Sequence, residues 1–351
     1  MIKRHLTRAV TVGHVGIGGE NPVSIQSMLN TKNGDVKSAI EQTVALKNAG
    51  CDIVRLAVTD EKSIDVVKAL KREVDIPLVA DIQFDYKMAL ASIKNGIDKV
   101  RLNPGNIGNK TKVKEVVVAA KERNIPIRIG VNTGSVSLDI AKKYGRYSAE
   151  GLVYEATRHI DILEALDFSD IVVSLKASDV KTMIDAYRLM AQKYEYPLHL
   201  GVTEAGPAYS GTIKSAIGIG SLLADGIGDT IRVSLTDNPV EEIRAAKEIL
   251  KSLDLREGSP KLISCPTCSR CSVNLIKIAA EVEKRLANLD KPITVAVMGC
   301  VVNGPGEASN ADIGITGANG EGLIFKGGKV VKRVPEESIV DELFEEIDKM
   351  F

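Results

Sequence analysis

Up to residue 250, the chain repeats one arrangement of hydrophobic and polar positions. A short run of mostly β-branched residues is followed by a polar turn, and then by a segment in which apolar residues recur every three or four positions. The short runs predict buried strands, and the wider spacing predicts amphipathic helices. The predicted strands are 23–26, 53–56, 78–82, 99–102, 127–131, 171–175, 198–202 and 230–234.

The segments between these strands carry clear helix signals. Apolar residues recur at helical spacing over 113–120 and 243–250, and Pro239 stands where the second of these helices would begin. Strands that alternate with helices pair in parallel through right-handed crossovers. Eight such units favour a TIM-type (β/α)8 barrel over an open doubly wound sheet, which usually has fewer units.

Two further segments bear on the ends of this barrel. The apolar segment 10–15 is predicted to be a strand that closes the bottom of the barrel. The longest connection, 133–151, contains several Gly, Ser and Tyr residues, and we interpret it as a mobile loop over the barrel mouth. An ordinary surface excursion is the alternative.

The pattern changes after a polar stretch at 253–260. Beyond it we expect a helix, a strand, a Gly-rich turn, three more strands and a final helix, which together form a small α+β module. Their predicted ranges are 272–286, 294–298, 303–307, 312–316, 322–326, 329–333 and 336–349. The sequence therefore predicts a substrate-binding barrel domain over 1–255 and a second domain over 256–351.

Composition excludes several classes of function. The 351 residues contain 46 Lys and Arg against 46 Asp and Glu, and this zero net charge argues against binding of nucleic acid or of an anionic membrane. No apolar run is long enough to span a bilayer, and the first residues lack the apolar stretch of a secretory signal. Aromatic residues are 4% of the chain, so base stacking is not expected. We expect a cytoplasmic protein.

Cations gather at the predicted strand ends, which in such a barrel meet at one mouth and form the active site. Like charges collect in one place when an anion lies between them, and guanidinium groups match phosphate oxygens in pairs. The pattern therefore predicts a phosphate or diphosphate site, although each cation taken alone could instead pair with a nearby acid. The cations are Arg55, Arg101, Arg128, Lys176 and Arg232.

Acidic and neutral polar residues stand at the same strand ends. Asp81 and Glu204 are the acids there, and both are candidates for acid–base catalysis. Their alternative role, above all for Asp81, is to neutralise and orient the cations. The neutral polar residues are Asn103, Asn132 and Ser234.

Lys176 also permits a rival interpretation. It could form a Schiff base in a phosphosugar aldolase whose C-terminal cysteines hold a structural zinc. His199, inside a predicted strand, is expected to be a core residue with satisfied hydrogen bonds, and Cys51 is expected to be a small buried hydrophobe.

The other four cysteines lie in the last quarter of the chain. Cys265, Cys268 and Cys271, with Cys300 downstream, have the spacing of a metal site in a reducing compartment, and zinc and iron–sulfur both fit it. Glu307 follows a Gly-Pro-Gly turn. A carboxylate ligand would leave one iron with an exchangeable oxygen donor, whereas four thiolates would make a closed electron carrier. Such a carrier would not explain the cations of the barrel.

A set of motifs, in one order over essentially the whole chain, resembles a known family. The motifs are SCPTCSR at 264–270, MGCVVNGPGE at 298–307, VRLAV at 54–58, VRLNPGNIG at 100–108, RIGVNTGS at 128–135 and GVTEAG at 201–206. The chain is similar to the 4-hydroxy-3-methylbut-2-en-1-yl diphosphate synthases of the methylerythritol phosphate route to isoprenoids, in their compact bacterial form.

The resemblance implies a barrel joined to an iron–sulfur domain like the cluster domains of sulfite and nitrite reductases. It implies a [4Fe–4S] cluster with three cysteine ligands and one glutamate ligand. Cys271 stands where the family carries no thiol, and we expect Glu307 to remain the fourth ligand because its turn matches the family pattern. The implied ligands are Cys265, Cys268, Cys300 and Glu307.

The resemblance also implies a reaction. Two electrons from reduced flavodoxin or ferredoxin would open the ring of 2-C-methyl-D-erythritol 2,4-cyclodiphosphate and expel water, giving 4-hydroxy-3-methylbut-2-enyl diphosphate. The five cations, with Asn103, Asn132 and Ser234, would hold the diphosphate, and Glu204 would supply a proton. A homodimer is implied, with the active site between the barrel of one chain and the cluster domain of the other.

Overall fold

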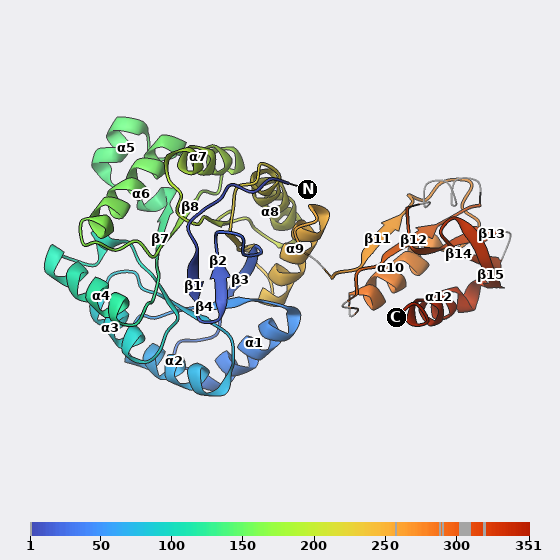
Figure 1. Cartoon of the computed structure of the whole chain (residues 1–351), viewed down its shortest axis with the longest axis horizontal. Helices are drawn as coiled ribbons and strands as arrows, with labels where there is room; N and C mark the ends of the chain where they lie inside the picture. The colour runs from blue at the N-terminus through green and yellow to red at the C-terminus, as the bar shows by residue number, and fades with distance from the viewer. Residues whose placement is uncertain (1, 257, 288, 290, 302–309, 319–320) are drawn as a thin grey trace. The chain divides into compact units, whose positions relative to one another are not determined.

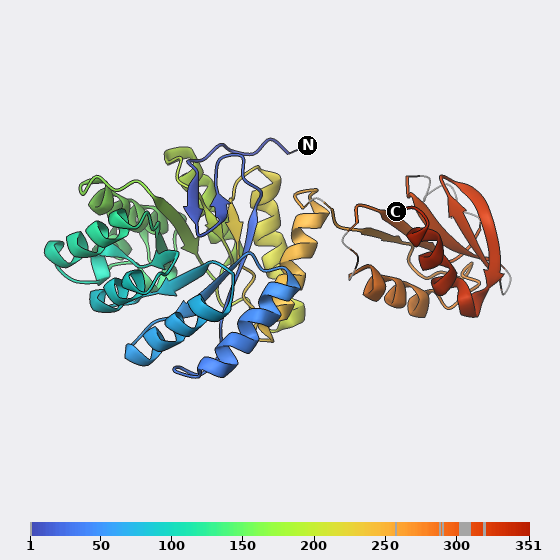
Figure 2. The same cartoon turned by 60° about the horizontal axis from the view of Figure 1, so that its bottom comes forward.

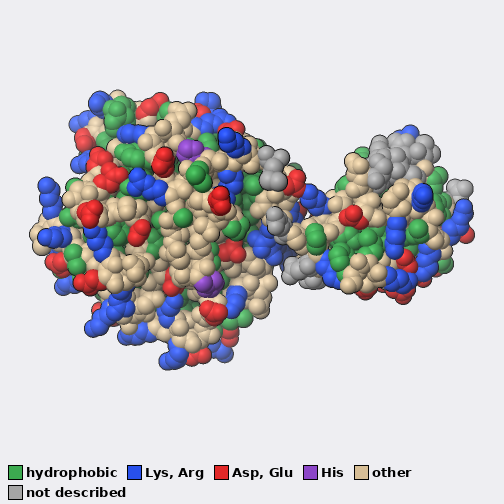
Figure 3. All heavy atoms as spheres, viewed as in Figure 1, with side chains coloured by type: hydrophobic (Ala, Val, Ile, Leu, Met, Phe, Trp, Pro, Cys, Tyr) green, Lys and Arg blue, Asp and Glu red, His purple; other side chains and the backbone are tan. Residues whose placement is uncertain are grey.

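A computed structural model describes residues 2–256, 258–287, 289, 291–301, 310–318 and 321–351. The chain divides into two compact units, Met1–Leu255 and Arg256–Phe351. Lys and Arg side chains are interspersed with Asp and Glu over the face of the first unit in Figure 3, as expected for a chain with zero net charge. Among the described helices, none combines the length and the apolar character that a membrane span needs.

An eight-stranded parallel sheet forms the barrel of the first unit and confirms the predicted fold. Its order is β8-β7-β6-β5-β4-β3-β10-β9, and a parallel bridge between Val173 and Leu198 brings β8 beside the chain that enters β9. The strands are β3 (Ser24–Met28), β4 (Ile53–Ala57), β5 (Leu78–Asp81), β6 (Lys99–Arg101), β7 (Ile127–Asn132), β8 (Ile171–Lys176), β9 (His199–Leu200) and β10 (Thr230–Ile231).

Helices surround these strands, as Figures 1 and 2 show from two directions. Many of the helices begin after a polar residue such as Asp35, Asp60 or Asp179, whose carboxylate accepts a hydrogen bond from a backbone N–H of the first turn. Their apolar faces pack on the outward side chains of the strands. The helices are α1 (Val36–Ala49), α2 (Glu61–Glu73), α3 (Tyr86–Lys94), α4 (Lys110–Glu122), α5 (Leu138–Tyr144), α6 (Ala149–Glu164), α7 (Val180–Lys193), α8 (Ala208–Ala224) and α9 (Pro239–Ser252).

The N-terminal apolar segment forms two strands where one was predicted. β1 (Val10–Val12) and β2 (Val15–Ile17) pair as an antiparallel hairpin, with Val10 opposite Ile17. The turn between them uses Gly13 at a φ of 61°, which a glycine adopts without strain. Hairpin side chains form one buried apolar cluster with residues from the beginnings of three barrel strands: Ile53, Val79 and Val172. The hairpin therefore closes the bottom of the barrel, as the segment was expected to do.

The prediction of a loop at 133–151 is wrong, because most of this segment is helical. The segment contains the 3-10 turn η2 (Thr133–Ser135), helix α5 and the first turn of α6. Its Gly, Ser and Tyr residues serve as helix ends and surface contacts: Gly145 ends α5 at a φ of 88°, and Ser148 caps α6. Tyr144 of α5 stacks on Tyr154 of α6, with ring centroids 4.1 Å apart.

The second unit is a mixed sheet with helices packed on it. The sheet order is β11-β12-β13-β14-β15, in which the first three strands are parallel and the last two pair antiparallel. Sequence analysis missed β11, because three of its four residues are exposed and its pattern resembles a loop. The elements are β11 (Lys261–Ser264), α10 (Leu275–Leu286), β12 (Thr294–Met298), β13 (Ile313–Ala318), β14 (Glu321–Lys326), β15 (Lys329–Pro335), η3 (Glu336–Ser338) and α12 (Ile339–Asp348).

Candidate active site in the barrel and candidate cluster site in the second unit

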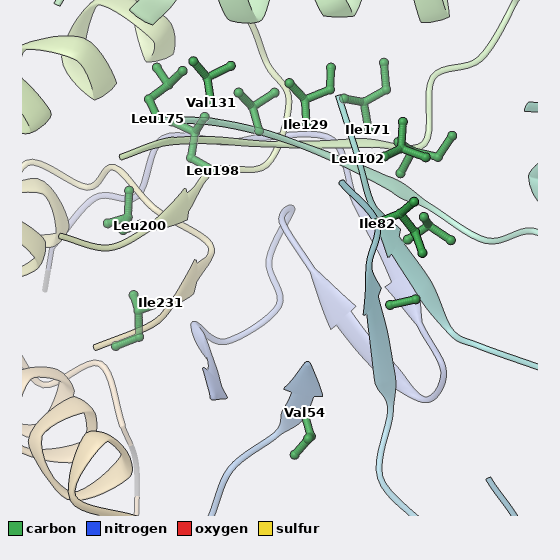
Figure 4. Close-up of a cluster of buried hydrophobic side chains, with 14 of the residues drawn as sticks. Val54, Ile82, Leu102, Ile129, Val131, Ile171, Leu175, Leu198, Leu200 and Ile231 are labelled. Carbon is green, nitrogen blue, oxygen red and sulfur yellow. The ribbon is translucent and has the colours of Figure 1, made fainter. Parts of the chain in front are cut away.

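The inner face of the barrel is polar. Successive side chains of a strand point to opposite faces of the sheet. In Figure 4, Ile129, Val131 and Leu175 belong to the apolar cluster between strands and helices. The residues that alternate with them, such as Arg128 and Lys176, therefore face the interior. All five predicted cations occupy interior positions of this kind. Arg101 and Lys176 end β6 and β8, Arg55 lies two residues before the end of β4, and Arg232 directly follows β10. Arg128 is instead the second residue of β7, where it pairs in register with Arg101, so it lies near the beginning of its strand and not at the predicted strand end.

Asp81 joins two of these cations. Its carboxylate accepts a hydrogen bond from Arg101 Nη1 at 3.1 Å, and Arg55 Nε lies 4.0 Å from its other oxygen. Burial alone would raise the pKa of Asp81, but the charges of Arg55, Arg101 and Arg128 outweigh burial and hold that pKa below its ordinary value. Asp81 is therefore ionised at neutral pH, which suits its predicted role of orienting the cations.

The other charged groups around Asp81, Arg55 and Arg101 are mostly positive. Arg128 is 1% exposed and donates to Ser174 Oγ at 2.8 Å, while its Nε and Nη2 have no hydrogen-bond partner among the described residues. Burial lowers the pKa of Lys176 well below its ordinary value, and Arg232, Arg55 and Arg128 lower it further. Burial also lowers the pKa of Arg55 to about 10, against the attraction of Asp81. An anion in the barrel would relieve this repulsion.

Glu242 of α9 is a site residue that sequence analysis missed. It is buried, and its carboxylate accepts from Ser27 Oγ at 2.8 Å, from the backbone N–H of Leu235 at 3.1 Å and from Arg232 Nη2 at 3.4 Å. The prediction considered only acids at strand ends. The helical spacing of α9 could have revealed it, because Glu242 falls on the same buried face as Ile249 and other apolar residues, where a charged side chain needs a partner.

Lys99 and His199 form a second part of the interior that the prediction did not foresee. Both are fully buried, and neither Lys99 Nζ nor either His199 ring nitrogen has a hydrogen-bond partner in the described parts of the chain. The expectation that His199 lies in the core is confirmed, but the hydrogen bonds expected for its ring are not found among the described residues. Burial lowers the pKa of Lys99, and Arg128 and Arg55 lower it further. Lys99 and His199 begin β6 and β9, so the polar interior extends toward the bottom of the barrel.

The other predicted barrel residues differ in how they are engaged. Asn103 is buried and exchanges two hydrogen bonds with the backbone of Gly130, at 2.9 and 3.1 Å, so it links the end of β6 to β7. Asn132 and Ser234 are half-buried at strand ends. Glu204 is exposed after β9 with a φ of 54°, and no hydrogen bond or ion pair joins it to the cations within the described structure. A non-glycine residue held at such a φ is a feature found at functional sites.

Two parallel strands bring the ends of the cysteine motif together. Cys265 directly follows β11, Cys300 follows β12, and the two strands are paired through Ser264 and Val297. The Gly299 N–H donates to Cys265 Sγ at 3.2 Å. Gly299 also lies against Cys271, because a Cβ at this position would approach Cys271 Sγ to 2.7 Å. Cys265, Cys271 and the segment before Cys300 therefore lie side by side.

The environment of these cysteines suits thiolate ligands. The pKa of Cys268 is lowered by a backbone hydrogen bond from Arg270 and next by the Arg270 side chain, which favours the thiolate. The five cysteines are free thiols, and Cys51 is buried as expected, with its pKa raised by burial to about 12. No three Cys, His, Asp or Glu side chains of the described chain are grouped as a site for one metal ion. Glu307 lies outside the described residues.

Both units match one protein family. A sequence model of the GcpE TIM-barrel domain matches residues 7–247, and one of the GcpE protein C-terminal domain matches residues 261–349. The chain belongs to the GcpE family. This membership confirms the family expected from the motifs.

Curated relatives of this GcpE chain share one name, 4-hydroxy-3-methylbut-2-en-1-yl diphosphate synthase (flavodoxin). The relative from Geobacillus thermodenitrificans is 57% identical over 350 residues, which cover 100% of this chain and 94% of the relative. The relative from Clostridium acetobutylicum is 57% identical over 349 residues, which cover 99% of this chain and 100% of the relative.

Solved structures of lower identity support the barrel of this GcpE chain and nothing beyond the fold. Dihydropteroate synthase from Yersinia pestis aligns with a TM-score of 0.50 at 15% identity, over 71% of this chain and 99% of that one. 3-Dehydroquinate dehydratase from Geobacillus kaustophilus aligns with the same TM-score of 0.50 and identity of 15%, again over 71% of this chain and 99% of that one.

Proposed function

We propose that this GcpE-family enzyme reduces 2-C-methyl-D-erythritol 2,4-cyclodiphosphate to 4-hydroxy-3-methylbut-2-enyl diphosphate, with electrons from flavodoxin or ferredoxin. The reaction takes up two electrons, opens the ring and releases one water. The observation that carries the proposal is the cationic interior of the barrel, together with the name shared by relatives that match the full chain. The rival aldolase has no comparable support, because Lys176 is one cation among several.

The charge of the substrate fits that of the interior. Each phosphate of a cyclic diphosphate carries one negative charge at neutral pH, and the interior offers five predicted cations against Asp81 and Glu242. Asp81 orients Arg55 and Arg101, and Glu242 orients Arg232. Their guanidinium groups keep further N–H donors, which can bind phosphate oxygens in pairs. Asn103, Asn132 and Ser234 would complete the contacts at the strand ends.

The second unit is proposed to hold a [4Fe–4S] cluster on Cys265, Cys268, Cys300 and Glu307. The pairing of β11 with β12, the Gly299 N–H on Cys265 and the lowered pKa of Cys268 support the thiolate ligands. Such a cluster would supply electrons one at a time. On the barrel side, Glu204 would give a proton to the departing oxygen, and Asp81 would keep the cations aligned throughout.

A homodimer that places the cluster unit of one chain over the barrel of another is proposed as well. Three large apolar side chains protrude from the segments that follow β5, β7 and β9, at the end of the barrel where the cations lie. These residues are Phe84, Leu138 and Tyr209, which are 71%, 69% and 83% exposed. A second protein surface would remove this apolar area from water.

Turnover by anaerobically purified protein tests the proposal. Protein with reconstituted iron and sulfide should be brown, absorb broadly near ~400 nm and convert the cyclic diphosphate in the presence of reduced flavodoxin, with the product identified by mass spectrometry. A colourless protein with stoichiometric zinc, or covalent trapping of a carbonyl substrate on Lys176 by borohydride, would overturn it.

Two cysteine variants distinguish a proposed cluster ligand from a cysteine that only lies near the cluster site. Cys271→Ser should keep the iron content and the absorbance of the wild type, because the proposed ligand set does not include Cys271. Cys265→Ser should lose most of the cluster, because it removes a ligand anchored at the end of β11. Iron and sulfide analysis measures both, and loss of iron in Cys271→Ser would make Cys271 a ligand.

Gly130→Ala should weaken substrate binding by about tenfold, the effect of one lost charge-assisted hydrogen bond. A Cβ at Gly130 would approach Arg101 Nε to 2.4 Å and push the guanidinium away from Asp81. Gly134→Ala is the matched control in the next turn of chain, because a Cβ there meets nothing within 4 Å. Calorimetric titration with the cyclic diphosphate measures both, and equal affinities would show that Arg101 does not bind the diphosphate.

A further inference from the structure

A buried histidine–glutamate pair lies on α6, outside the set of groups described above. His159 is 3% exposed and Glu155 is 4% exposed. His159 Nε2 lies 3.4 Å from Glu155 Oε1, one helical turn away. Charged side chains are almost never fully buried unless they are paired. The pair therefore has a specific task in the fold.

Each end of the pair reaches a different loop of the barrel mouth. His159 Nδ1 accepts a hydrogen bond from the backbone N–H of Gly105 at 3.2 Å, in the 3-10 turn η1 (Pro104–Asn106) that follows β6. The other carboxylate oxygen of Glu155 accepts from the Ser137 backbone N–H at 2.8 Å and from Ser137 Oγ at 2.6 Å. Ser137 follows β7 and η2. One chain of hydrogen bonds thus connects two neighbouring loops through α6.

The direction of these bonds fixes the chemistry of the pair. Because Nδ1 accepts from an N–H, it carries no proton, and Nε2 must carry the ring proton and donate it to Glu155. Glu155 then acts only as an acceptor, toward both His159 and Ser137. Burial would raise the pKa of Glu155, but the hydrogen bonds from His159 and Ser137 lower it to about 2. The carboxylate is therefore ionised over the whole physiological range.

The fit at the first loop is tight. A Cβ on Gly105 would come within 2.8 Å of His159 Cε1, so only a glycine allows the loop to approach the ring this closely. Asn103, two residues earlier, is held to the backbone of Gly130 in β7 by two hydrogen bonds. The loop after β6 is thus attached at one point to β7 and at the next to α6.

We infer that His159 and Glu155 are positioning residues, which hold the loops after β6 and β7 at the spacing that substrate binding needs. The inference rests on the proposed function, because Asn103 and Asn132, which flank these loops, are among the groups proposed to contact the substrate. Within the described residues, the hydrogen bonds and the ion pair of His159 and Glu155 join them to each other, to Gly105 and to Ser137, so the pair acts through these two loops. Displacement of a positioned group by about 1 Å can lower the rate of an enzyme by roughly a hundredfold.

Glu155→Gln tests the inference with almost no change of volume. The glutamine amide oxygen can still accept from Ser137, but the amide N–H2 group then faces the Nε2–H of His159, and two donors cannot form a hydrogen bond. If the ring proton moved to Nδ1 instead, that N–H would face the N–H of Gly105, which is again a donor against a donor. We expect KM for the cyclic diphosphate to rise by about tenfold or more, with iron content and thermal midpoint near those of the wild type. His159→Asn should give a similar rise, and the double variant should add little to either single variant.

Glu164→Gln is the matched control on the same helix. Its carboxylate accepts from the Tyr196 hydroxyl at 2.7 Å, which an amide oxygen can replace, so its KM should equal that of the wild type. If the wild type turns over and Glu155→Gln keeps its KM, or loses only thermal stability, the inference is overturned. If Glu155→Gln does not fold, Ser137→Ala replaces it and should raise KM less steeply, and an unchanged KM there also overturns the inference. Absence of turnover in the wild type would instead refute the proposed function.

Discussion

Glu204→Gln should lower kcat by roughly a hundredfold to ten-thousandfold while substrate affinity stays within about twofold of the wild type. Glutamine keeps the shape of the side chain and the unusual backbone conformation at a φ of 54°, but it cannot donate the proton that the departing oxygen needs. Affinity should persist because the described structure joins Glu204 to none of the cations. Single-turnover kinetics with reduced protein, together with calorimetric titration, measure the two quantities separately.

Asp167→Asn is the control for this variant. Asp167 also has a positive φ, of 56°, and loses a negative charge in the same way, but it lies in the turn between α6 and β8 at the opposite end of the barrel. Its kcat should not change. An unchanged kcat in Glu204→Gln as well would remove Glu204 from proton transfer.

Lys99→Met should stabilise the protein by about 2 kcal/mol at neutral pH. The lysine is fully buried, its Nζ has no hydrogen-bond partner among the described residues, and the charges that act on it are those of Arg128 and Arg55. Methionine fills a similar volume and brings no amine into the barrel. A barrel of this size should then unfold at a temperature higher by roughly 5 °C, as differential scanning calorimetry can show.

The pH dependence gives a second check on Lys99. Its pKa is lowered in the folded state, so the unfolded chain binds more protons below the ordinary lysine pKa of 10.5. The stability of the wild type should therefore rise as pH approaches that value, and the advantage of Lys99→Met should shrink between pH 7 and pH 10. Lys68→Met, at an exposed position of α2, should show neither effect. A destabilised Lys99→Met would mean that the amine has a partner in solution.

Sequence patterns placed the barrel strands well because each strand is a short buried run with one apolar face. They failed at 133–151, where stacking of Tyr144 on Tyr154 stabilises a short helix whose own sequence looks like a loop. They also missed β11, whose exposed residues are specified by pairing with β12 rather than by burial. In both cases tertiary contacts, which local patterning does not contain, decide the structure.

Some residues of the candidate site could be predicted from the sequence, and others depend on tertiary contacts. Arg101 and Lys176 could be predicted because strand ends of a barrel meet at one mouth, whatever the details of packing. Glu242 and the His159–Glu155 pair could not, because they approach the mouth from helices, and only the register of a helix on the sheet decides which loop its side chains reach. Lys99 could not be predicted either. It follows the pattern of an ordinary strand residue, and the sequence alone does not show that its side chain lies buried in a polar interior.

The β1–β2 hairpin limits the access of water to the charged interior of the barrel. Bulk solvent entering from below would screen the cations and compete for every phosphate contact. Val10, Val12 and Ile17 seal that end with aliphatic carbon, packed on the first residues of the barrel strands. With this end covered by apolar side chains, the charges inside the barrel are shielded from solvent on that side. Binding at the opposite end, where the strands finish, then takes place in a low-dielectric interior in which ionic contacts are stronger.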